Sequence, residues 1–294
     1  MDDIKMIDFI KIKITDDTLI NNIWSNDLLQ YDGKSEKRFN DEIKELMIKK
    51  YKNIYFTKYH KRIEISGSLH YFSNNCVHNS NDFSITECIN TINDLKDLFN
   101  LDLHKCKIIN LEFGVNIVPC INVEDLVHNL MYHEKRQFNR PTKHFYYKIA
   151  GNEAYKHIKA YDKSVQFPNF CKNTFRFEVK SKQSKFINSL KLFTLNDLTN
   201  KSIYNYLSNV LIKEWDKVLL FDLSKKIEEK YFNTLFWEDI LKNGNRNKFN
   251  NQKIRYYKKL GTENLHSQIR KILMEKLQSL KTVQFPTNIY LETA

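Results

Sequence analysis

The first part of the chain alternates apolar and charged residues with a period of two. Isoleucine occupies positions 10, 12 and 14, and lysine occupies positions 11 and 13. A period of two puts alternate side chains on opposite faces of a β-strand. The segments 54–59 and 62–69 have the same character, and the second ends at a Ser-Gly-Ser bend. These segments are therefore predicted to be half-buried strands.

The remaining segments up to residue 182 predict an α+β order. Ser84 and Glu87 form a Ser-x-x-Glu capping box, so a helix is predicted to begin there and to continue toward Asn100. A second helix is predicted at residues 123–133. Further strands are predicted at residues 107–118, 144–149, 155–162 and 173–180. This order favours a largely antiparallel sheet with flanking helices.

Beyond residue 183 the apolar spacing becomes helical. One stripe runs from Ile203 through Leu211 and Trp215 to Val218 and Leu219. We therefore predict two parts, an α+β domain over residues 1–182 and a helical, basic region over residues 183–294.

The charge of the chain indicates a polyanionic partner. It has 47 Lys and Arg against 35 Asp and Glu, a net charge of +12, and nucleic acid is the default partner for such a balance. Between residues 243 and 281, ten basic residues accompany two acidic ones. A charge-dense helix can also be only a solvated face. The residues predicted to contact DNA phosphates are Arg246, Lys248, Lys253, Arg255 and Lys258.

Several classes of protein are disfavoured. The sequence has no stretch of about 18 uncharged apolar residues, and residues 1–5 lack the order of a signal peptide. A cytoplasmic protein with no membrane partner is therefore expected. The five cysteines include no pair at the two-residue spacing typical of zinc ligands, so reduced thiols are expected.

Three acidic residues stand inside predicted strands. Glu112 lies in a run of apolar residues, Glu178 follows Arg176 by two positions, and Asp162 is followed by Lys163. A buried carboxylate needs either a divalent cation or a pairing with Arg or Lys. The spacing alone leaves both answers open, a metal site and a structural ladder of ion pairs.

Several blocks of sequence resemble the rolling-circle replication initiators of phages and plasmids. They lie at residues 62–72 with 79–83, 110–117, 160–163 and 176–180. Their order and spacing resemble the filamentous-phage replication protein group most closely and the plasmid initiators that act in trans more distantly. The last hundred or so residues resemble the family only loosely.

The resemblance implies a site-specific DNA endonuclease and strand transferase that initiates replication. A tyrosine attacks a phosphodiester at the origin and leaves a 5′-phosphotyrosyl link and a free 3′-hydroxyl. The resemblance implies that residues 1–182 nick the DNA and hold the metal, and that residues 183–294 bind DNA. The implied partners are double- and single-stranded origin DNA, with a host helicase and polymerase.

Site residues are carried over from the same resemblance. Glu112 and Glu178 match the acids of the family and are implied as ligands of Mg²⁺ or Mn²⁺, with Asp162 as a third candidate. Lys163 and Arg176 are candidates to neutralise the developing phosphate charge or to pair with those acids. None of the nine histidines stands two residues from another, which disfavours the related class that binds metal through a histidine pair.

The nucleophile must be chosen among 16 tyrosines. Tyr256 is our first choice, because Lys259 lies about one helical turn away, where a cation lowers the pKa of a phenol. The spacing also resembles the Tyr-x-x-Lys pattern of nicking enzymes. Tyr161 is expected to pack behind Asp162. The other candidates are Tyr257, Tyr204, Tyr206 and Tyr231.

Two alternatives without nicking chemistry remain. One is a non-catalytic, sequence-specific DNA-binding initiator or repressor, in which the acids are ion pairs. The other is a module for single-stranded nucleic acid, in which exposed sheet aromatics stack on bases. The aromatics in question are Tyr55, Phe56, Tyr146 and Tyr147.

Overall fold

The computed structural model describes residues 6–39, 42–140, 147–152, 155–244 and 246–279. Within these residues a nine-stranded sheet runs in the order β2-β3-β4-β5-β1-β6-β11-β10-β9, and every neighbouring pair is antiparallel. Its strands are β1 (Ile7–Ile14), β2 (Gln30–Phe39), β3 (Glu42–Tyr51), β4 (Ile54–Tyr59), β5 (Arg62–Ser68), β6 (Lys107–Ile117), β9 (Tyr147–Asn152), β10 (Lys156–Asp162) and β11 (Phe175–Ser181).

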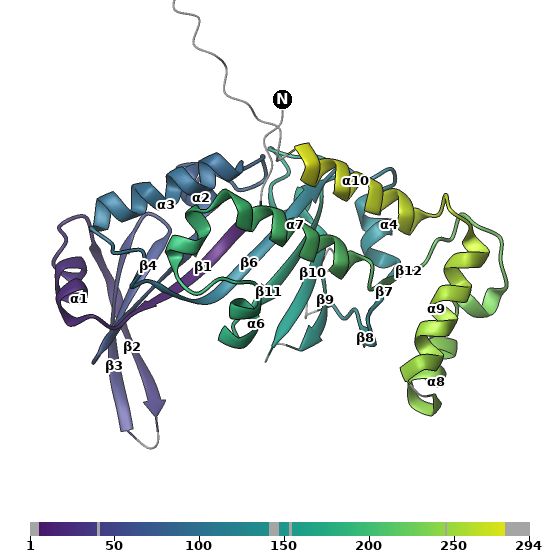
Figure 1. Cartoon of the computed structure of the whole chain (residues 1–294), viewed down its shortest axis with the longest axis horizontal. Helices are drawn as coiled ribbons and strands as arrows, with labels where there is room; N and C mark the ends of the chain where they lie inside the picture. The colour runs from purple at the N-terminus through teal and green to yellow at the C-terminus, as the bar shows by residue number, and fades with distance from the viewer. Residues whose placement is uncertain (1–5, 40–41, 141–146, 153–154, 245, 280–294) are drawn as a thin grey trace, which may run out of the picture.

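A smaller, three-stranded sheet and the helices complete the fold (Figure 1). The small sheet has the order β12-β7-β8, with β7 (Leu130–His133), β8 (Arg136–Gln137) and β12 (Val218–Leu220). The helices are α1 (Asp17–Trp24), α2 (Leu69–Ser73), α3 (Ile85–Phe99), α4 (Val123–His128), α5 (Lys163–Gln166), α6 (Ser184–Ser189), α7 (Lys201–Trp215), α8 (Thr234–Asn243), α9 (Arg246–Leu260) and α10 (Leu265–Ser279).

One face of the large sheet is apolar and lies under helices. Ile10, Ile12 and Ile14 of β1 are buried, whereas the lysines between them are half-buried, as the period of two predicts. Helices α3, α7 and α10 run along this face (Figure 1), and their buried residues share one hydrophobic cluster with the strands. Trp215 of α7, for example, packs edge-on against Phe177 of β11.

The predicted α+β class with a largely antiparallel sheet is confirmed. The capping box is also confirmed, because the Glu87 amide donates to Ser84 Oγ at 3.0 Å and the Ser84 amide donates to the Glu87 carboxylate at 2.6 Å. The antiparallel hairpin of β2 and β3 was not predicted.

Two local predictions are wrong. The helix predicted at residues 123–133 ends at His128, and Leu130–His133 is strand β7. The apolar stripe predicted to reach Val218 and Leu219 ends with α7 at Trp215. Both departures have one cause, since Val218 pairs with His133 in the small sheet and this long-range pairing overrides the local helical spacing. Residues 144–146 of the strand predicted at 144–149 lie outside the described residues.

The main hydrophobic cluster crosses the predicted domain boundary. It contains residues from Met6 to Leu277, including buried positions of α7 and α10. A second cluster lies beneath α8 and α9 and contains Trp237, Phe249 and Tyr256. The division into residues 1–182 and 183–294 stays a prediction. No helix in the described ranges is both long enough and apolar enough to span a membrane.

Candidate active site

Four charged residues meet on the face of the sheet opposite the apolar one. Lys159 of β10 lies opposite Glu178 of β11, and Lys180 of β11 lies opposite Glu112 of β6. Directly opposite residues of antiparallel strands project from the same face. The sheet register therefore brings together side chains that are far apart in the sequence.

Glu178 is the most enclosed acid of this group. It is 0% exposed, it accepts a hydrogen bond from Arg176 Nε at 2.5 Å, and it forms an ion pair with Lys159. Burial by itself raises the pKa of this carboxyl, but Lys159 and Arg176 outweigh burial and hold the pKa at about 2. Glu178 is therefore ionised at neutral pH.

Lys159 bridges the two predicted metal ligands. Its ammonium lies 2.8 Å from the Glu112 carboxylate and also contacts Glu178. Lys180 forms a second ion pair with Glu112. Burial by itself lowers the pKa of Lys159, but Glu178 and the neighbouring groups raise it well above its ordinary value. Lys159 and Glu178 are thus both charged at neutral pH.

Arg176 extends the group to an acid that the sequence did not single out. This arginine is 0% exposed, and it donates to Asn116 Oδ1 at 3.0 Å and lies 3.3 Å from Asp8 Oδ2. Asp8 also accepts hydrogen bonds from Ser68 Oγ at 2.7 Å and from Asn79 Nδ2 at 3.0 Å. We call Asp8, Glu112, Lys159, Arg176, Glu178 and Lys180 the charge cluster.

Asp8 was missed because its position depends on a break in strand register. Between Ile7 and Phe9 the pairing of β1 with β6 shifts by one residue, and such bulges re-aim a side chain. The available signal in the sequence is an acid between two apolar residues, Ile7 and Phe9.

Two tyrosines lie beside the charge cluster. The Tyr161 hydroxyl donates to Glu178 at 3.5 Å, and its ring centroid lies 5.2 Å from that of Tyr147. Tyr161 therefore packs into the cluster rather than behind Asp162. Lys159 Nζ lies 5.8 Å from each ring centroid. Tyr147 is half-buried, whereas Tyr161 is buried, and burial, opposed in part by Lys159, raises the pKa of Tyr147 to about 12.

The third predicted metal ligand has another task. Asp162 caps α5, where its carboxylate accepts hydrogen bonds from the amide and the hydroxyl of Ser164. Lys163 is buried and donates to Gln166 at 3.0 Å. Burial lowers the pKa of Lys163 to about 8, and nearby Asp8 opposes that shift.

The three predicted metal ligands do not form one ligand set. Glu112 and Glu178 share Lys159 as partner, and Asp162 is engaged by Ser164. Across the described ranges, no group of three or more His, Cys, Asp or Glu is arranged to hold a metal ion. The requirement for Mg²⁺ or Mn²⁺ stays a prediction.

Tyr256 and Tyr257 lie in α9 and are not brought to the charge cluster. The Tyr256 hydroxyl donates to Leu220 O and accepts from the Asp222 amide, each at 3.0 Å. The Tyr257 hydroxyl makes the same two kinds of bond at Val218 and Leu220, also at 3.0 Å. Burial raises the pKa of both phenols above the ordinary value.

The other predicted catalytic groups have partners outside the charge cluster. Lys259 pairs with Glu228 at 2.7 Å. Tyr204 donates to Leu198 O at 2.8 Å, and Tyr231 is buried in the cluster beneath α8 and α9. Tyr206 donates to Ser189 O at 3.4 Å.

The predicted DNA-binding residues differ in their surroundings. Lys253 is half-buried and donates to the carbonyls of Asp216 and Lys217 at 3.2 Å each, so it caps the end of α7. Lys248, Arg255 and Lys258 are exposed. Arg246 begins α9, and its side chain lies outside what the structure describes.

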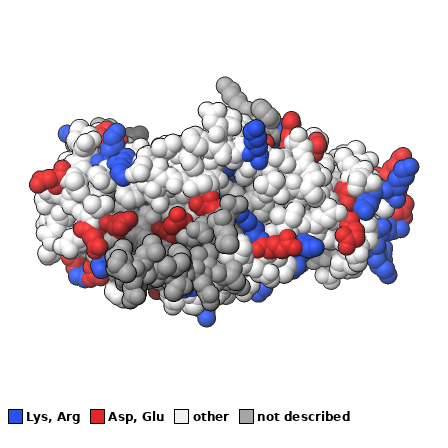
Figure 2. All heavy atoms as spheres, turned by 90° about the horizontal axis from the view of Figure 1, so that it is seen from above, with Lys and Arg blue, Asp and Glu red and all other residues white. Residues whose placement is uncertain are grey.

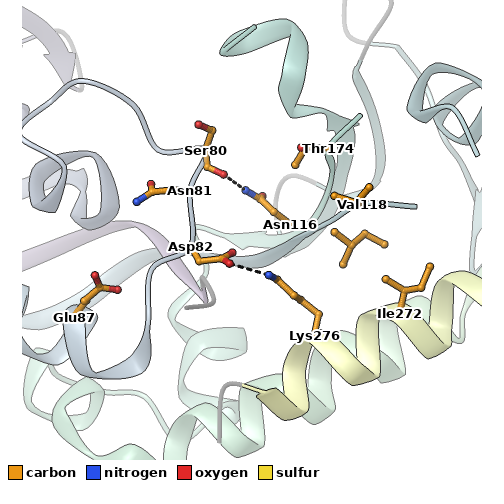
Figure 3. Close-up of a pocket in the computed structure, with 10 residues that line it drawn as sticks. Ser80, Asn81, Asp82, Glu87, Asn116, Val118, Thr174, Ile272 and Lys276 are labelled. Atoms are coloured by element: carbon orange, nitrogen blue, oxygen red, sulfur yellow. Dashed lines mark hydrogen bonds and ion pairs between the residues drawn. The ribbon is translucent and has the colours of Figure 1, made fainter. Parts of the chain in front are cut away.

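A pocket of about 640 Å³ adjoins the charge cluster at the end of β6 (Figure 3). Asn116 lines it and donates to Ser80 O at 3.1 Å, while its carbonyl oxygen accepts from Arg176. Asp82 and Lys276 form an ion pair of 2.8 Å across the pocket (Figure 3). The arrangement links a cavity large enough for a nucleotide to the buried guanidinium.

Comparison with known proteins gives one likeness to report. No protein-family model matches the chain, and no curated protein matches it. Among solved structures, the chain is similar to the rolling circle replication initiator protein from Geobacillus stearothermophilus. The TM-score is 0.42 at 11% sequence identity, and the match covers 81% of this chain and 94% of that one.

Proposed function

We propose that the chain is a rolling-circle DNA replication initiator that nicks one strand and transfers it. The observation that carries the proposal is the charge cluster beside Tyr147 and Tyr161. Two tyrosine hydroxyls, which can act as nucleophiles, lie on one face of the sheet with fixed cations and carboxylates. The whole chain has a net charge of +12. Phosphoryl transfer is catalysed mainly by positioning and by stabilising negative charge.

Tyr147 is the nucleophile that the geometry supports best. It is half-buried on β9, an edge strand of the sheet, whereas Tyr161 is buried and its hydroxyl bonds to Glu178. Burial raises the pKa of Tyr147, and Lys159, which lies next to its ring, opposes that shift. Tyr256, the first choice from sequence, has both hydrogen-bonding positions of its hydroxyl occupied by backbone.

The reaction forms one bond and breaks one. The Tyr147 phenolate oxygen attacks the phosphorus, after its proton has passed to water, and the bond from phosphorus to the 3′-oxygen breaks. The leaving 3′-oxygen takes up a proton to give the 3′-hydroxyl, and the 5′-phosphate stays on the tyrosine. Lys159 and Lys180 are the partly exposed cations available to the phosphate.

Each remaining cluster residue has a positioning task in this proposal. Arg176 holds Asp8, Asn116 and Glu178 together, and Glu178 and Glu112 fix the ammonium of Lys159. No step is assigned to a divalent metal, and the metal requirement is tested by chelation. Origin DNA, a host helicase, a host polymerase and a cytoplasmic location belong to the same proposal.

A nicking assay tests the proposal. Purified protein is incubated with supercoiled DNA that carries its own replicon's origin, in Mn²⁺, Mg²⁺ or EDTA, and denaturing gels reveal protein-linked 5′ ends. We expect an adduct that Tyr147→Phe abolishes and Tyr256→Phe retains. Tyr55→Phe is the matched control, because Tyr55 is another partly exposed tyrosine of the same sheet.

One observation favours a second candidate, a non-catalytic DNA-binding initiator or repressor. The acids of the charge cluster already have cationic partners, Lys159 and Lys180 at Glu112 and Arg176 at both Asp8 and Glu178. These ion pairs compensate the buried charges of the acids, so the acids need no catalytic role. Sequence-selective binding without a nick under all three metal conditions would establish this candidate and overturn the nickase.

The module for single-stranded nucleic acid has less support. Phe56 is 0% exposed in the core, although Tyr55 is 43% exposed. Tyr146 lies outside the described residues. The described aromatics of this set therefore do not form one exposed stacking platform.

A further inference from the structure

Helix α9 is held rigidly by one face. Phe249, Tyr256 and Leu260 are buried in the cluster beneath α8 and α9. The hydroxyls of Tyr256 and Tyr257 bond to the backbone of residues 218–222, which fixes both the rotation and the axial position of the helix. A helix anchored in this way presents its opposite face in a defined orientation.

The opposite face of α9 is exposed and carries a distinctive set of side chains. Positions three, four and seven apart share one side of a helix, and those opposite the buried positions are all exposed. They are Asn247, Asn250, Asn251, Ile254, Arg255 and Lys258. Ile254 is 63% exposed in the middle of this polar face, and the packing of the helix gives no reason for an apolar side chain there.

The charge of α9 favours a polyanion on this face. The helix contains six Lys and Arg and no Asp or Glu. Of the nearby acids, Glu228 pairs with Lys259 of α9 itself, whereas Glu238 lies 3.7 Å from Lys242 and Asp239 accepts from Asn243 at 2.6 Å. Figure 2 shows Lys and Arg gathered at the end of the molecule formed by α8 and α9, with acidic side chains among them.

We infer that α9 is a recognition helix that reads base edges in the major groove of duplex origin DNA. The inference rests on the proposed function for the identity of the DNA. The major groove is about 12 Å wide and admits one α-helix. Asn pairs with adenine, Arg with guanine, and an apolar side chain contacts the thymine methyl group. Asn251, Arg255 and Ile254 supply these three chemistries, and Lys258 supplies a phosphate contact.

The test selects binding sites from a pool of random-sequence duplexes with the full chain. Selected duplexes and an unselected duplex of mixed sequence are then compared by fluorescence anisotropy at several salt concentrations. Wild type is expected to enrich a motif that contains guanine, adenine and thymine. Arg255→Ala and Asn251→Ala are each expected to weaken the selected duplex about tenfold and to lose preference at one position. Lys258→Ala should weaken both duplexes equally and lower the salt slope by about 1.

Matched controls separate base reading from general effects. Ile254→Ala is expected to lose the preference for thymine at one position of the motif. Leu235→Ala is its control, because Leu235 of the adjacent helix α8 is 67% exposed. Lys213→Ala of α7 removes an exposed positive charge elsewhere. Both controls should leave the motif and the affinity unchanged within twofold or so. Thermal unfolding of every variant checks that the fold is intact.

Three outcomes would overturn the inference. They are enrichment of no motif, a motif unchanged in Arg255→Ala and Asn251→Ala, and an equal loss of affinity in Arg255→Ala and Lys213→Ala. The recognition helix and the proposed function can fail separately. If the protein nicks DNA at a motif that the α9 variants do not change, the recognition helix is ruled out and the nickase is not. A motif read by α9 in a protein that never nicks would remove the nickase and keep the recognition helix.

Discussion

Lys159 is the residue on which the charge cluster depends most. Its single ammonium forms ion pairs with both Glu112 and Glu178, and it lies beside the rings of Tyr147 and Tyr161. A buried charge that loses its partner is costly, because the remaining charge cannot recover its hydration.

Replacing Lys159 by methionine is therefore expected to lower the free energy of unfolding by about 3 kcal/mol at pH 7. The variant keeps the length of the side chain and removes its charge. Lys180→Met is the control and should cost less, because Lys180 is more exposed and has Glu112 as its one ion-pair partner in the described structure. Urea unfolding measures both. Equal losses for the two variants would contradict the central place given to Lys159.

Gly114 determines how closely β6 and β11 approach behind Glu178. A Cβ atom at this position would contact Glu178 Cβ, and it would lie 2.5 Å from Phe177 O and 2.7 Å from Glu178 Cα. Those atoms belong mostly to backbone and cannot move aside. The position therefore requires glycine for space rather than for its backbone angles.

We expect Gly114→Ala to lower the free energy of unfolding by about 1–3 kcal/mol, as overpacking typically does. Thermal unfolding followed by circular dichroism measures this effect. Asn110→Ala, on the same strand, is the control and should cost less than Gly114→Ala. A Gly114→Ala protein as stable as wild type would show that the two strands can separate at this point.

The sequence predicted part of the residue-scale site. Glu112, Glu178 and Arg176 are among the predicted residues, because a charged residue between apolar ones can be recognised from the sequence of a single strand. Tyr147 was considered only as a stacking residue, and Asp8 was not considered. Their places depend on the register between strands and on a bulge, which spacing within one segment does not encode.

At the scale of elements, a buried ionic group joins the small sheet to α7. Glu214 of α7 lies 2.9 Å from His133 Nε2 of β7 and 2.5 Å from Lys156 of β10. Burial by itself raises the pKa of Glu214, but His133 and Lys156 outweigh it and hold the pKa at about 2.

This pKa predicts acid sensitivity. A carboxyl whose pKa is lower in the folded than in the unfolded chain stabilises the fold above the unfolded pKa, and that contribution is lost as pH falls through the folded pKa. Glu214→Gln is expected to cost about 2 kcal/mol at pH 7, and its difference from wild type should shrink between pH 4.5 and about 2.

Urea unfolding at a series of pH values measures this difference. Glu228→Gln is the control, because Glu228 pairs with Lys259 on the surface, where an ion pair contributes little. A Glu214→Gln deficit that stays constant down to pH 2 would contradict the assigned role of the carboxylate.

A helix or strand can be predicted from the sequence where neighbouring residues determine it. It cannot be predicted in this way where pairing with a distant strand determines it. The alternation in β1 and the capping box of α3 are local signals, and both predictions hold. Strands β7 and β12 pair residues that are 85 to 90 positions apart in the sequence, and the residues around each strand have a helical pattern. The helical pattern was correct for α7, which ends where its Trp215 packs against β11.

At the scale of the whole molecule, the two faces of the large sheet have different tasks. Helices α3, α7 and α10 cover the apolar face and form the main hydrophobic cluster. The other face carries the charge cluster with Tyr147 and Tyr161. Helices α8 and α9 lie at one end of the molecule on a hydrophobic cluster of their own (Figure 1).

This arrangement separates the proposed chemistry from the proposed reading of the origin. The sequence predicted a basic C-terminal region but not which side of α9 faces the core. Tyr256 of α9 packs against Tyr231 and Trp237, and this packing sets the side of α9 that faces the core. The opposite side, with Asn251, Ile254 and Arg255, is exposed.

We propose that Tyr147 at the charge cluster attacks origin DNA. The most direct measurement traps the protein on DNA carrying its own replicon's origin, digests the DNA and the protein, and locates the attached nucleotide by mass spectrometry. We expect the nucleotide on the peptide that contains Tyr147, attached to the oxygen of that residue. A nucleotide on Tyr256 or on any other residue, or no adduct on DNA that the protein binds, would contradict it.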